Sequence, residues 1–237
     1  MQEPALNFLY DDGVIFALDK PSGVHSVALR GKVNASIARL LLAWEPSLKD
    51  AAQKPEDAGL INRLDYETSG LLLGAHTRSA WEAFSKLLKS GEIKKSYHVL
   101  LEGKLLGEES VKGWLGSPNR GAKKIRVYAS KPRTHDRALP AASIITPERY
   151  DAKRDVTTAH VKCDSARRHQ VRAHCAFIGH PLTGDSLYGS KRIFKEFFPN
   201  VSERDFFLHA ATAEFKHPVS GKEIKLVSAD PIFRSIK

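Results

Sequence analysis

Asp65 is the residue of this chain best placed to do chemistry. It stands two positions after Arg63, in a short polar segment between the apolar runs of residues 59–61 and 71–73. A carboxylate fixed beside a guanidinium can serve as a nucleophile or as a general base. The same two residues also fit a turn closed by the aspartate, with an ion pair at the surface. Taken alone, the segment leaves both interpretations open.

The flanking apolar runs predict how this segment is held. Each run is long enough for a buried strand, and the residues between them, up to Gly70, are rich in turn formers. We therefore expect a strand, a tight turn and a second strand, with Arg63 and Asp65 at the mouth of a rigid scaffold.

A strand and two helices are predicted on either side of this centre. Residues 14–18 form a short apolar run typical of a strand, and Lys20 follows it, either as a solvated surface lysine or as a phosphate contact. Apolar spacing predicts one helix that is capped by Asn34. A second helix is predicted between its cap, Thr77, and Gly91 at its end.

Three later segments have the patterns of strands. They are residues 94–101, residues 157–163 and the region 206–227, whose turn at 217–222 predicts a hairpin. Tyr97 lies in the first of them. It is either an ordinary core tyrosine or a platform on which a nucleic-acid base stacks.

A basic arm between positions 117 and 137 is a candidate interaction surface. Its cations are Arg120, Lys123, Lys124, Arg126, Lys131, Arg133 and Arg137, against the single acid Asp136. Glycine and proline interrupt any helical period, and residues 127–128 predict only a short strand. The arm is either a solvated loop or a surface that follows a phosphate backbone, and the charge of the whole chain favours the second interpretation.

Cations also gather where a later helix is predicted to begin. Arg167, Arg168 and His169 precede a helix that Gly179 ends. A helix dipole disfavours cations at that end, so a bound anion or carboxylate is a better explanation for them. The spacing of His169 and His174 matches no standard zinc set, and no metal site is expected.

Composition limits the class of protein. The chain has 237 residues and a formal net charge of +10, with a pI near 9.6, which favours a polyanionic partner and nucleic acid first. Charge alone does not exclude a solubility role or a membrane-facing patch. Two cysteines, Cys163 and Cys175, predict no disulfide framework and fit a reducing cytosol. We expect neither a signal peptide nor a membrane helix.

Several motifs follow one another along the chain. They are Lys20-Pro21-x-Gly23, Asn62-Arg63-Leu64-Asp65-x-x-Thr68-Ser69-Gly70, the segment 165–174, Gly179-His180-Pro181-Leu182-x-Gly184-Asp185-x-x-Tyr188-Gly189, Leu208-His209-Ala210 and His217-Pro218-x-x-Gly221. Together they resemble the RluA-type family of RNA pseudouridine synthases, over nearly the whole chain. Two departures are Asn62, where the family usually has histidine, and Ala166, where it usually has glycine.

The resemblance implies an isomerase that converts specific uridines of structured RNA to pseudouridine without a cofactor or a metal. It implies that Asp65 is the catalytic carboxylate and acts at the ribose of a uridine flipped out of its stack. Tyr97 would offer the flipped base a π-face, and Arg167 would pair with Asp65 and keep it ionised. Arg63 would fill the space left by the base, and Leu208 would close the apolar side of the pocket.

The remaining expected substrate contacts are the cations Lys123, Lys124, Arg126 and Arg168. The implied fold is α+β, with a mixed, largely antiparallel sheet flanked by helices and a central basic catalytic cleft. We expect residues 1–237 to form a single catalytic domain without the family's N-terminal S4-like domain, because the first family strand begins near residue 14. The expected protein is a cytoplasmic monomer that acts on rRNA or tRNA, with no membrane contact and no obligatory protein partner.

Two other functions stay open. A catalytically silent RNA-binding or ribosome-assembly protein of the same fold would explain the charge, but it gives Asp65, Tyr97 and Arg167 no purpose. A glycosidase or nuclease using Asp65 with Glu67 would need two carboxylates that converge on one bond. The sequence identifies neither the target RNA nor the modified position.

Overall fold

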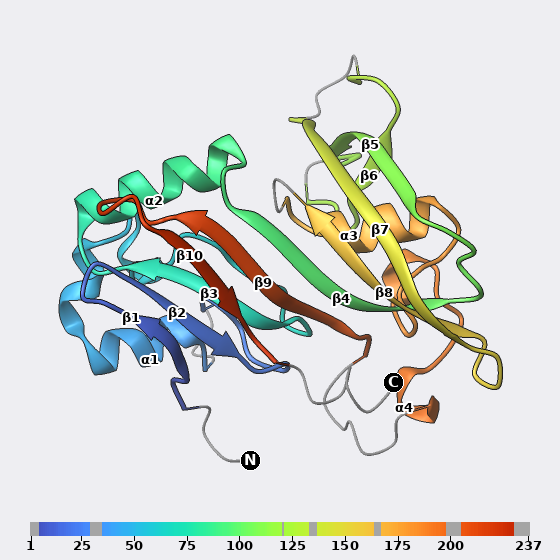
Figure 1. Ribbon diagram of the computed structural model, residues 1–237, viewed down its shortest axis with the longest axis horizontal. Coiled ribbons are helices and arrows are strands. Elements are labelled where there is room, and N and C mark those ends of the chain that lie inside the picture. Colours follow the sequence, from blue (N-terminus) through green and yellow to red (C-terminus); the bar gives the residue numbers. More distant parts are fainter. Residues whose placement is uncertain are drawn as a thin grey trace. The chain divides into compact units, whose positions relative to one another are not determined.

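The structure is a computed structural model that describes residues 5–28, 35–119, 121–132, 137–163, 167–197 and 205–229 (Figure 1). The chain folds into two compact units. The first runs to Lys94 and takes up the chain again from Ala210, and the second runs from Lys95 to His209. That the two units act as a single catalytic domain stays a prediction.

The first unit is built on a sheet to which both halves of the chain contribute. Its strands are β1 (Phe8–Asp11), β2 (Ile15–Lys20), β3 (Ser69–Ala75), β9 (Leu208–Lys216) and β10 (Glu223–Val227). The order is β1, β2, β3 and β9, and β10 pairs with β9 as the predicted hairpin. Every residue of β3 is buried, so the strand that follows the Asp65 segment is the centre of this sheet.

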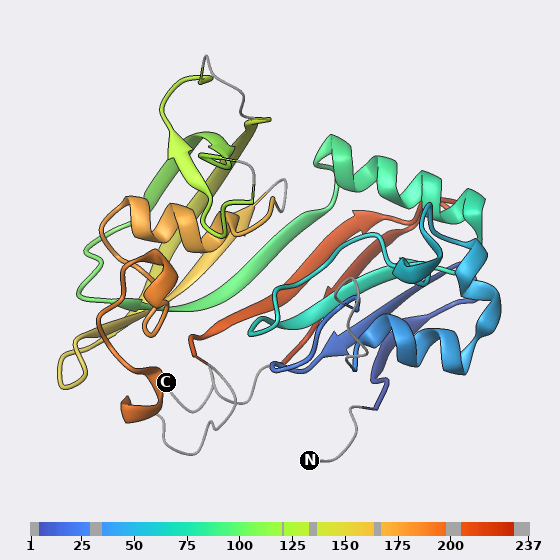
Figure 2. The same cartoon turned by 180° about the vertical axis from the view of Figure 1, so that it is seen from behind.

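Two α-helices pack on this sheet because each has one apolar side. α1 (Ile37–Trp44) buries that side in a cluster with side chains of β2 and β3, and it covers one face of β1 and β2 (Figure 2). α2 (Arg78–Ser90) packs Phe84 against Phe215 of β9, with ring centroids 4.8 Å apart. Two short 3-10 helices, η1 (Pro46–Asp50) and η2 (Pro55–Asp57), lead from α1 toward the Asp65 segment.

The caps of these helices confirm one prediction and correct another. Thr77 caps α2 and Gly91 ends it in the left-handed region with φ 78°, as predicted. The prediction of Asn34 as the cap of α1 is wrong: Asn34 lies outside the described residues, and α1 begins at Ile37 with Ser36 as its cap. The Ser36 hydroxyl accepts a backbone N–H of the first turn at 3.3 Å, which satisfies a donor that the helix itself leaves unpaired.

The second unit is a second set of paired strands with its helices on one side. Its strands are β4 (Lys94–Glu102), β5 (Glu109–Gly116), β6 (Arg126–Tyr128), β7 (Leu139–Asp151) and β8 (Val156–Cys163), in the order β4, β8, β7, β5, β6. α3 (Gln170–Phe177) packs on them through a cluster that includes Ala173, Leu115 and Ala141. η3 (Ser186–Tyr188) and α4 (Phe194–Phe197) follow.

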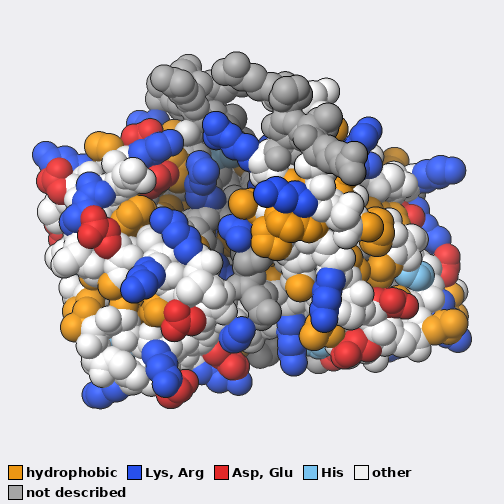
Figure 3. Space-filling model, turned by 90° about the horizontal axis from the view of Figure 1, so that it is seen from above, with side chains coloured by type: hydrophobic (Ala, Val, Ile, Leu, Met, Phe, Trp, Pro, Cys, Tyr) orange, Lys and Arg blue, Asp and Glu red, His pale blue; other side chains and the backbone are white. Residues whose placement is uncertain are grey.

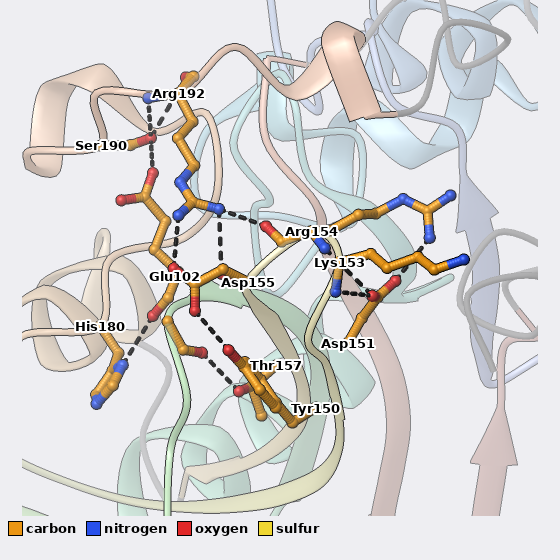
Figure 4. A network of polar contacts seen from close by, with 11 residues as sticks. Glu102, Tyr150, Asp151, Lys153, Arg154, Asp155, Thr157, His180, Ser190 and Arg192 are labelled. Atoms are coloured by element: carbon orange, nitrogen blue, oxygen red, sulfur yellow. Dashed lines mark hydrogen bonds and ion pairs between the residues drawn. The ribbon is translucent and has the colours of Figure 1, made fainter.

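A polar network ties the β7–β8 turn to the segment after α3 (Figure 4). Arg192 pairs with Asp155 at 2.7 Å, and Tyr150 donates its hydroxyl hydrogen to the same carboxylate at 2.8 Å. Ser190 donates to Glu102 at the end of β4. The network therefore anchors the chain between η3 and α4 to two strands of this unit.

The architecture confirms the predicted α+β class. The strand pairs whose register is described, such as β2–β3, β4–β8 and β7–β8, are antiparallel. The predicted central basic cleft stays a prediction. Among the residues that the structure describes, no helix combines the length and the apolar character needed to cross a membrane.

Candidate active site

The segment that carries Asp65 is a loop anchored to one strand, and the predicted strand before it is wrong. Residues 61–68 have no regular structure, and Leu60 forms only an isolated bridge with Gly74. The backbone pairs with β3 only as far as Ile61: Gly59 accepts the N–H of Ala75 at 3.0 Å, and Ile61 donates to the carbonyl of Leu73 at 2.9 Å. From there the side chain of Asn62 takes over, accepting the N–H of Leu73 at 2.7 Å and donating to the carbonyl of Leu71 at 3.3 Å. The backbone pairing is therefore too short for a strand.

A second segment, residues 20–26, lines the Asp65 loop on its other side. Ser26 bonds to both backbone polar groups of Leu64, at 2.9 Å each. The N–H of Gly23 donates to the carbonyl of Tyr66 at 2.9 Å, and the His25 and Tyr66 rings lie 4.7 Å apart. The residues before and after Asp65 are thus both held from residues 20–26.

Lys20 belongs to this support, and its prediction as a solvated or phosphate-binding lysine is wrong. Its side chain is fully buried. Its Nζ donates to the carbonyls of Pro21 at 2.8 Å, Val24 at 2.7 Å and Tyr66 at 3.4 Å. An ammonium surrounded by carbonyl oxygens is stabilised in a buried position. Tyr66 lies 46 positions after Lys20 in the chain, so a local sequence pattern could not predict this contact.

Within the loop, Asp65 is half-buried and Arg63 is exposed. Arg63 lies near Asp57, where burial raises the pKa of the Asp57 carboxyl and the Arg63 charge opposes that rise. At the loop's end, Gly70 has φ +104°, and a Cβ there would lie 2.3 Å from the carbonyl oxygen of Ala210. A side chain at position 70 would therefore push β3 away from β9.

Tyr97 lies in the second unit, on the buried face of β4. It is 5% exposed, as is Leu208 at the start of β9. Lys95 shares the face of Tyr97, because side chains two positions apart in a strand point the same way. Burial lowers the pKa of Lys95 to about 8, and Cys163 opposes the shift. Lys95 Nζ has no hydrogen-bond partner among the described residues. The alternation of residues 94–101 contained this signal, since it places a lysine in line with Tyr97.

A row of buried polar side chains crosses the strands next to Lys95. Cys163 stands opposite Lys95 in β8, and Ser143 stands opposite Cys163 in β7. Ser143 Oγ also contacts His174 Nδ1 at 2.8 Å and Gln170 Nε2 at 3.1 Å. Burial lowers the pKa of His174 to about 4, so this histidine is neutral at pH 7.

Gln170, the first residue of α3, holds the backbone of Arg167. Its side-chain Oε1 accepts the N–H of Arg167 at 3.0 Å, and its backbone N–H donates to the Arg167 carbonyl at 3.0 Å. His169 between them adopts the left-handed conformation with φ 53°, which bends the chain into the helix. Arg167 is half-buried, and its buried Nε has no hydrogen-bond partner in the described part of the chain.

Arg168 points to the basic arm instead. Its guanidinium donates to the carbonyls of Ala122 at 3.4 Å and Lys123 at 2.9 Å. Tyr188 holds the same loop, since its hydroxyl accepts the N–H of Ile125 at 2.9 Å and its ring lies under Lys124 Nζ, 5.2 Å from the centroid. These contacts fix the backbone of residues 121–126.

The side chains of Lys123, Lys124 and Arg126 are exposed on this fixed loop. The predicted short strand of the arm is confirmed as β6, whereas Arg120 and Arg133 lie outside the described residues. Lysine and arginine side chains are spread over the face shown in Figure 3, with fewer acidic side chains between them. The arm therefore presents cations whose backbone positions are set in advance.

The predicted site residues thus fall into two groups. Asp65 and Arg63 belong to the first unit, and Tyr97, Arg167, Arg168, Leu208 and the arm belong to the second. The pairing of Arg167 with Asp65 stays a prediction. Two supporting residues, Ser26 and Gln170, were not predicted from the sequence, and neither was the buried Lys95 beside Tyr97.

A sequence model of the family described as RNA pseudouridylate synthase matches residues 14–177. The chain belongs to this family. The match includes Asp65, Tyr97 and Arg167, and it confirms the resemblance that the motifs predicted. In this member of the family, the loop that carries Asp65 is held by Asn62 and by residues 20–26.

The relatives have consistent descriptions. The ribosomal large subunit pseudouridine synthase D of Nitrosomonas europaea is 32% identical over 226 residues, which are 92% of this chain and 60% of that protein. The protein of the same description in Xanthomonas campestris is 30% identical, over 97% of this chain and 67% of its own length. The chain therefore spans about 60% of the length of the first relatives it matches.

A solved structure supports the fold of this family member. The human RNA pseudouridylate synthase domain containing 1 superposes with a TM-score of 0.71, covering 100% of this chain and 89% of that one. The two sequences are 20% identical, so the structural similarity establishes the fold but not the substrate or the site residues.

Proposed function

We propose that this protein isomerises uridine to pseudouridine in RNA, and that large-subunit ribosomal RNA is its substrate. The observation that carries the proposal is the Asp65 loop, in which an aspartate of the family motif is held by Asn62 on one side and residues 20–26 on the other. The named relatives, which are described as acting on the ribosomal large subunit, support the choice of RNA.

The reaction assigns a role to each group. Asp65 acts at the ribose while the C1′–N1 bond of the flipped uridine breaks. The uracil turns and its C5 bonds to C1′. The C5 proton is then lost to solvent, and the nitrogen released from C1′ takes up a proton, so the product is an isomer of uridine. Tyr97 supplies the π-face against the base, and the low exposure of Tyr97 and Leu208 suits an apolar wall. Arg167 is assigned to pair with Asp65 and to orient its carboxylate, because a guanidinium can bond to both carboxylate oxygens.

The RNA backbone is assigned to the exposed cations of the arm. A formal net charge of +10 and a loop fixed by Arg168 and Tyr188 both support a polyanionic partner. We infer that the protein acts as a cytoplasmic monomer. The alternative, a silent RNA-binding or ribosome-assembly protein, shares these cations and differs only in the chemistry.

Tritium release separates the two functions. Unmodified large-subunit ribosomal RNA, transcribed with tritium at C5 of uridine, should lose tritium with the wild-type protein because C5 gives up its hydrogen. Asp65→Asn should abolish release while RNA affinity and the folded structure persist. Unchanged product mass distinguishes isomerisation from hydrolysis. RNA binding without release by the wild type would favour the silent alternative, and near-native release by Asp65→Asn would overturn the assignment of Asp65.

A further inference from the structure

Ser26 makes an unusual pair of contacts with the residue that precedes Asp65. Its hydroxyl donates to the carbonyl of Leu64 at 2.9 Å and accepts the N–H of the same residue at 2.9 Å. Ser26 is 3% exposed and Leu64 is half-buried, so both bonds are partly shielded from water. One side chain therefore fixes both peptide groups that flank the Cα of Leu64.

The position of Ser26 is itself fixed by the core. Its carbonyl accepts the N–H of Ala38 at 3.0 Å, and the carbonyl of His25 accepts the N–H of Ile37 at 3.0 Å. Ile37 and Ala38 begin α1 and are each 1% exposed. The hydroxyl of Ser26 thus connects the loop before Asp65 to a helix packed in the core of the first unit.

The other supports of the loop act at different points. Asn62 bonds to β3 three residues before Asp65, and the carbonyls of Tyr66 and Glu67 are held after it by Gly23 and Ser22. The direction of the Asp65 side chain depends on the peptide between residues 64 and 65. Ser26 is the described side chain that bonds to the carbonyl of that peptide.

We propose that Ser26 is a positioning residue for Asp65, setting the direction of its carboxylate through the backbone of Leu64. The inference rests on the proposed function, in which Asp65 reacts at the ribose. Without the hydroxyl, both backbone groups of Leu64 lose a buried partner and the 64–65 peptide is free to turn. A displacement of a reacting group by about 1 Å can cost on the order of 100-fold in rate.

The kinetic test is Ser26→Ala, with Thr157→Val as the matched control. Ser26→Ala should lower kcat for tritium release roughly 10- to 100-fold and leave the Kd for the ribosomal transcript unchanged. Thr157 is also buried, at 0% exposure, and its hydroxyl likewise bonds to two backbone groups, the carbonyl of Gly103 at 2.7 Å and the N–H of Leu105 at 3.2 Å, which lie outside the Asp65 loop. Its variant should lose stability without losing kcat. Ser26→Thr keeps the hydroxyl and should recover most of the rate, and Ser26→Cys replaces Ser26→Ala if the alanine variant does not fold.

Amide hydrogen exchange tests whether Ser26 holds the backbone of Leu64, and this measurement does not depend on catalytic activity. Exchange at the Leu64 N–H should accelerate in Ser26→Ala and stay at the wild-type rate in Thr157→Val. Unchanged exchange at Leu64, or an equal kcat for Ser26→Ala and the wild type, would overturn the inference. If the wild-type protein released no tritium, the proposed function would fail, and the exchange rates would still decide whether Ser26 holds the loop.

Discussion

At the scale of single residues, small polar side chains hold backbone around the proposed catalytic residues. Asn62 and Ser26 do so before Asp65, and Gln170 does so at Arg167. Asn62 stands where the family usually has histidine, and its amide both donates and accepts toward β3. Because the Asn62 amide both donates and accepts, an asparagine in place of the usual histidine can still hold the loop against β3.

Lys95 is the residue whose burial has the clearest consequence for stability. Its pKa is lowered from 10.5 in the unfolded reference to about 8 in the folded protein. Between these values the unfolded chain binds more protons, so the free energy of unfolding should rise as pH increases from 8 to 10.5. Below about pH 8 the full cost of burying the charge is present.

Lys95→Met should therefore raise the free energy of unfolding at pH 7, by up to about 3 kcal/mol. The variant should also lack the increase in stability between pH 8 and 10.5. Urea unfolding across this pH range measures both effects, with Lys94→Met as a control because Lys94 is exposed. A Lys95→Met protein that is less stable than the wild type at pH 7 would show that the ammonium has stabilising partners.

At the scale of elements, the start of α3 carries the cations that a helix dipole disfavours. Gln170 holds the backbone of Arg167 at this point: its side-chain oxygen accepts the N–H of Arg167, and its backbone N–H donates to the Arg167 carbonyl. Its side-chain amide also donates to the carbonyl of Ala142 at 2.9 Å and to Ser143. The sequence predicted where the helix begins, because its apolar period is local. It did not predict the role of Gln170, because the partners of its amide lie 27 and 28 positions earlier in the chain.

Gln170→Met should impair catalysis in the same direction as Arg167→Met, but by a smaller factor. Arg167→Met removes the guanidinium that is assigned to pair with Asp65, so the single-turnover rate should fall far more than RNA affinity. Gln170→Met leaves that guanidinium in place and removes only the side-chain bond to the Arg167 N–H. Single-turnover rates and RNA affinities measure the two effects. Variants that lose RNA affinity while the single-turnover rate stays unchanged would make Arg167 a phosphate contact.

At the scale of the whole molecule, the class of the fold and the order of its motifs could be predicted, whereas several local supports could not. Strand alternation and helix caps are local, which is why β4, β8, α2 and the β9–β10 hairpin agree with their predictions. The predictions of a solvated Lys20 and of a strand before Asp65 were wrong, because tertiary contacts determine the structure at both places. A lysine after a strand is normally solvated, and only the carbonyl oxygens around Nζ make it internal.

The charge of the molecule predicts how RNA binding responds to salt. Log Kobs should fall linearly with the logarithm of salt concentration, because each phosphate that binds a cation of the protein releases counterions. Replacing Lys123, Lys124 and Arg126 with alanine should make this slope shallower by up to about one unit for each phosphate that is no longer neutralised. The three side chains are exposed on a loop that Arg168 and Tyr188 hold, so their removal should leave the fold intact.

The matched control for this arm variant removes the same charge elsewhere. Lys49, Lys54 and Lys89 are exposed lysines of the first unit, and replacing them with alanine lowers the net charge by an equal amount. If binding depended only on total charge, both triple variants would change the slope alike. A local interface predicts a shallower slope for the arm variant alone, and a slope that stays unchanged in the arm variant would exclude Lys123, Lys124 and Arg126 from the RNA-binding surface.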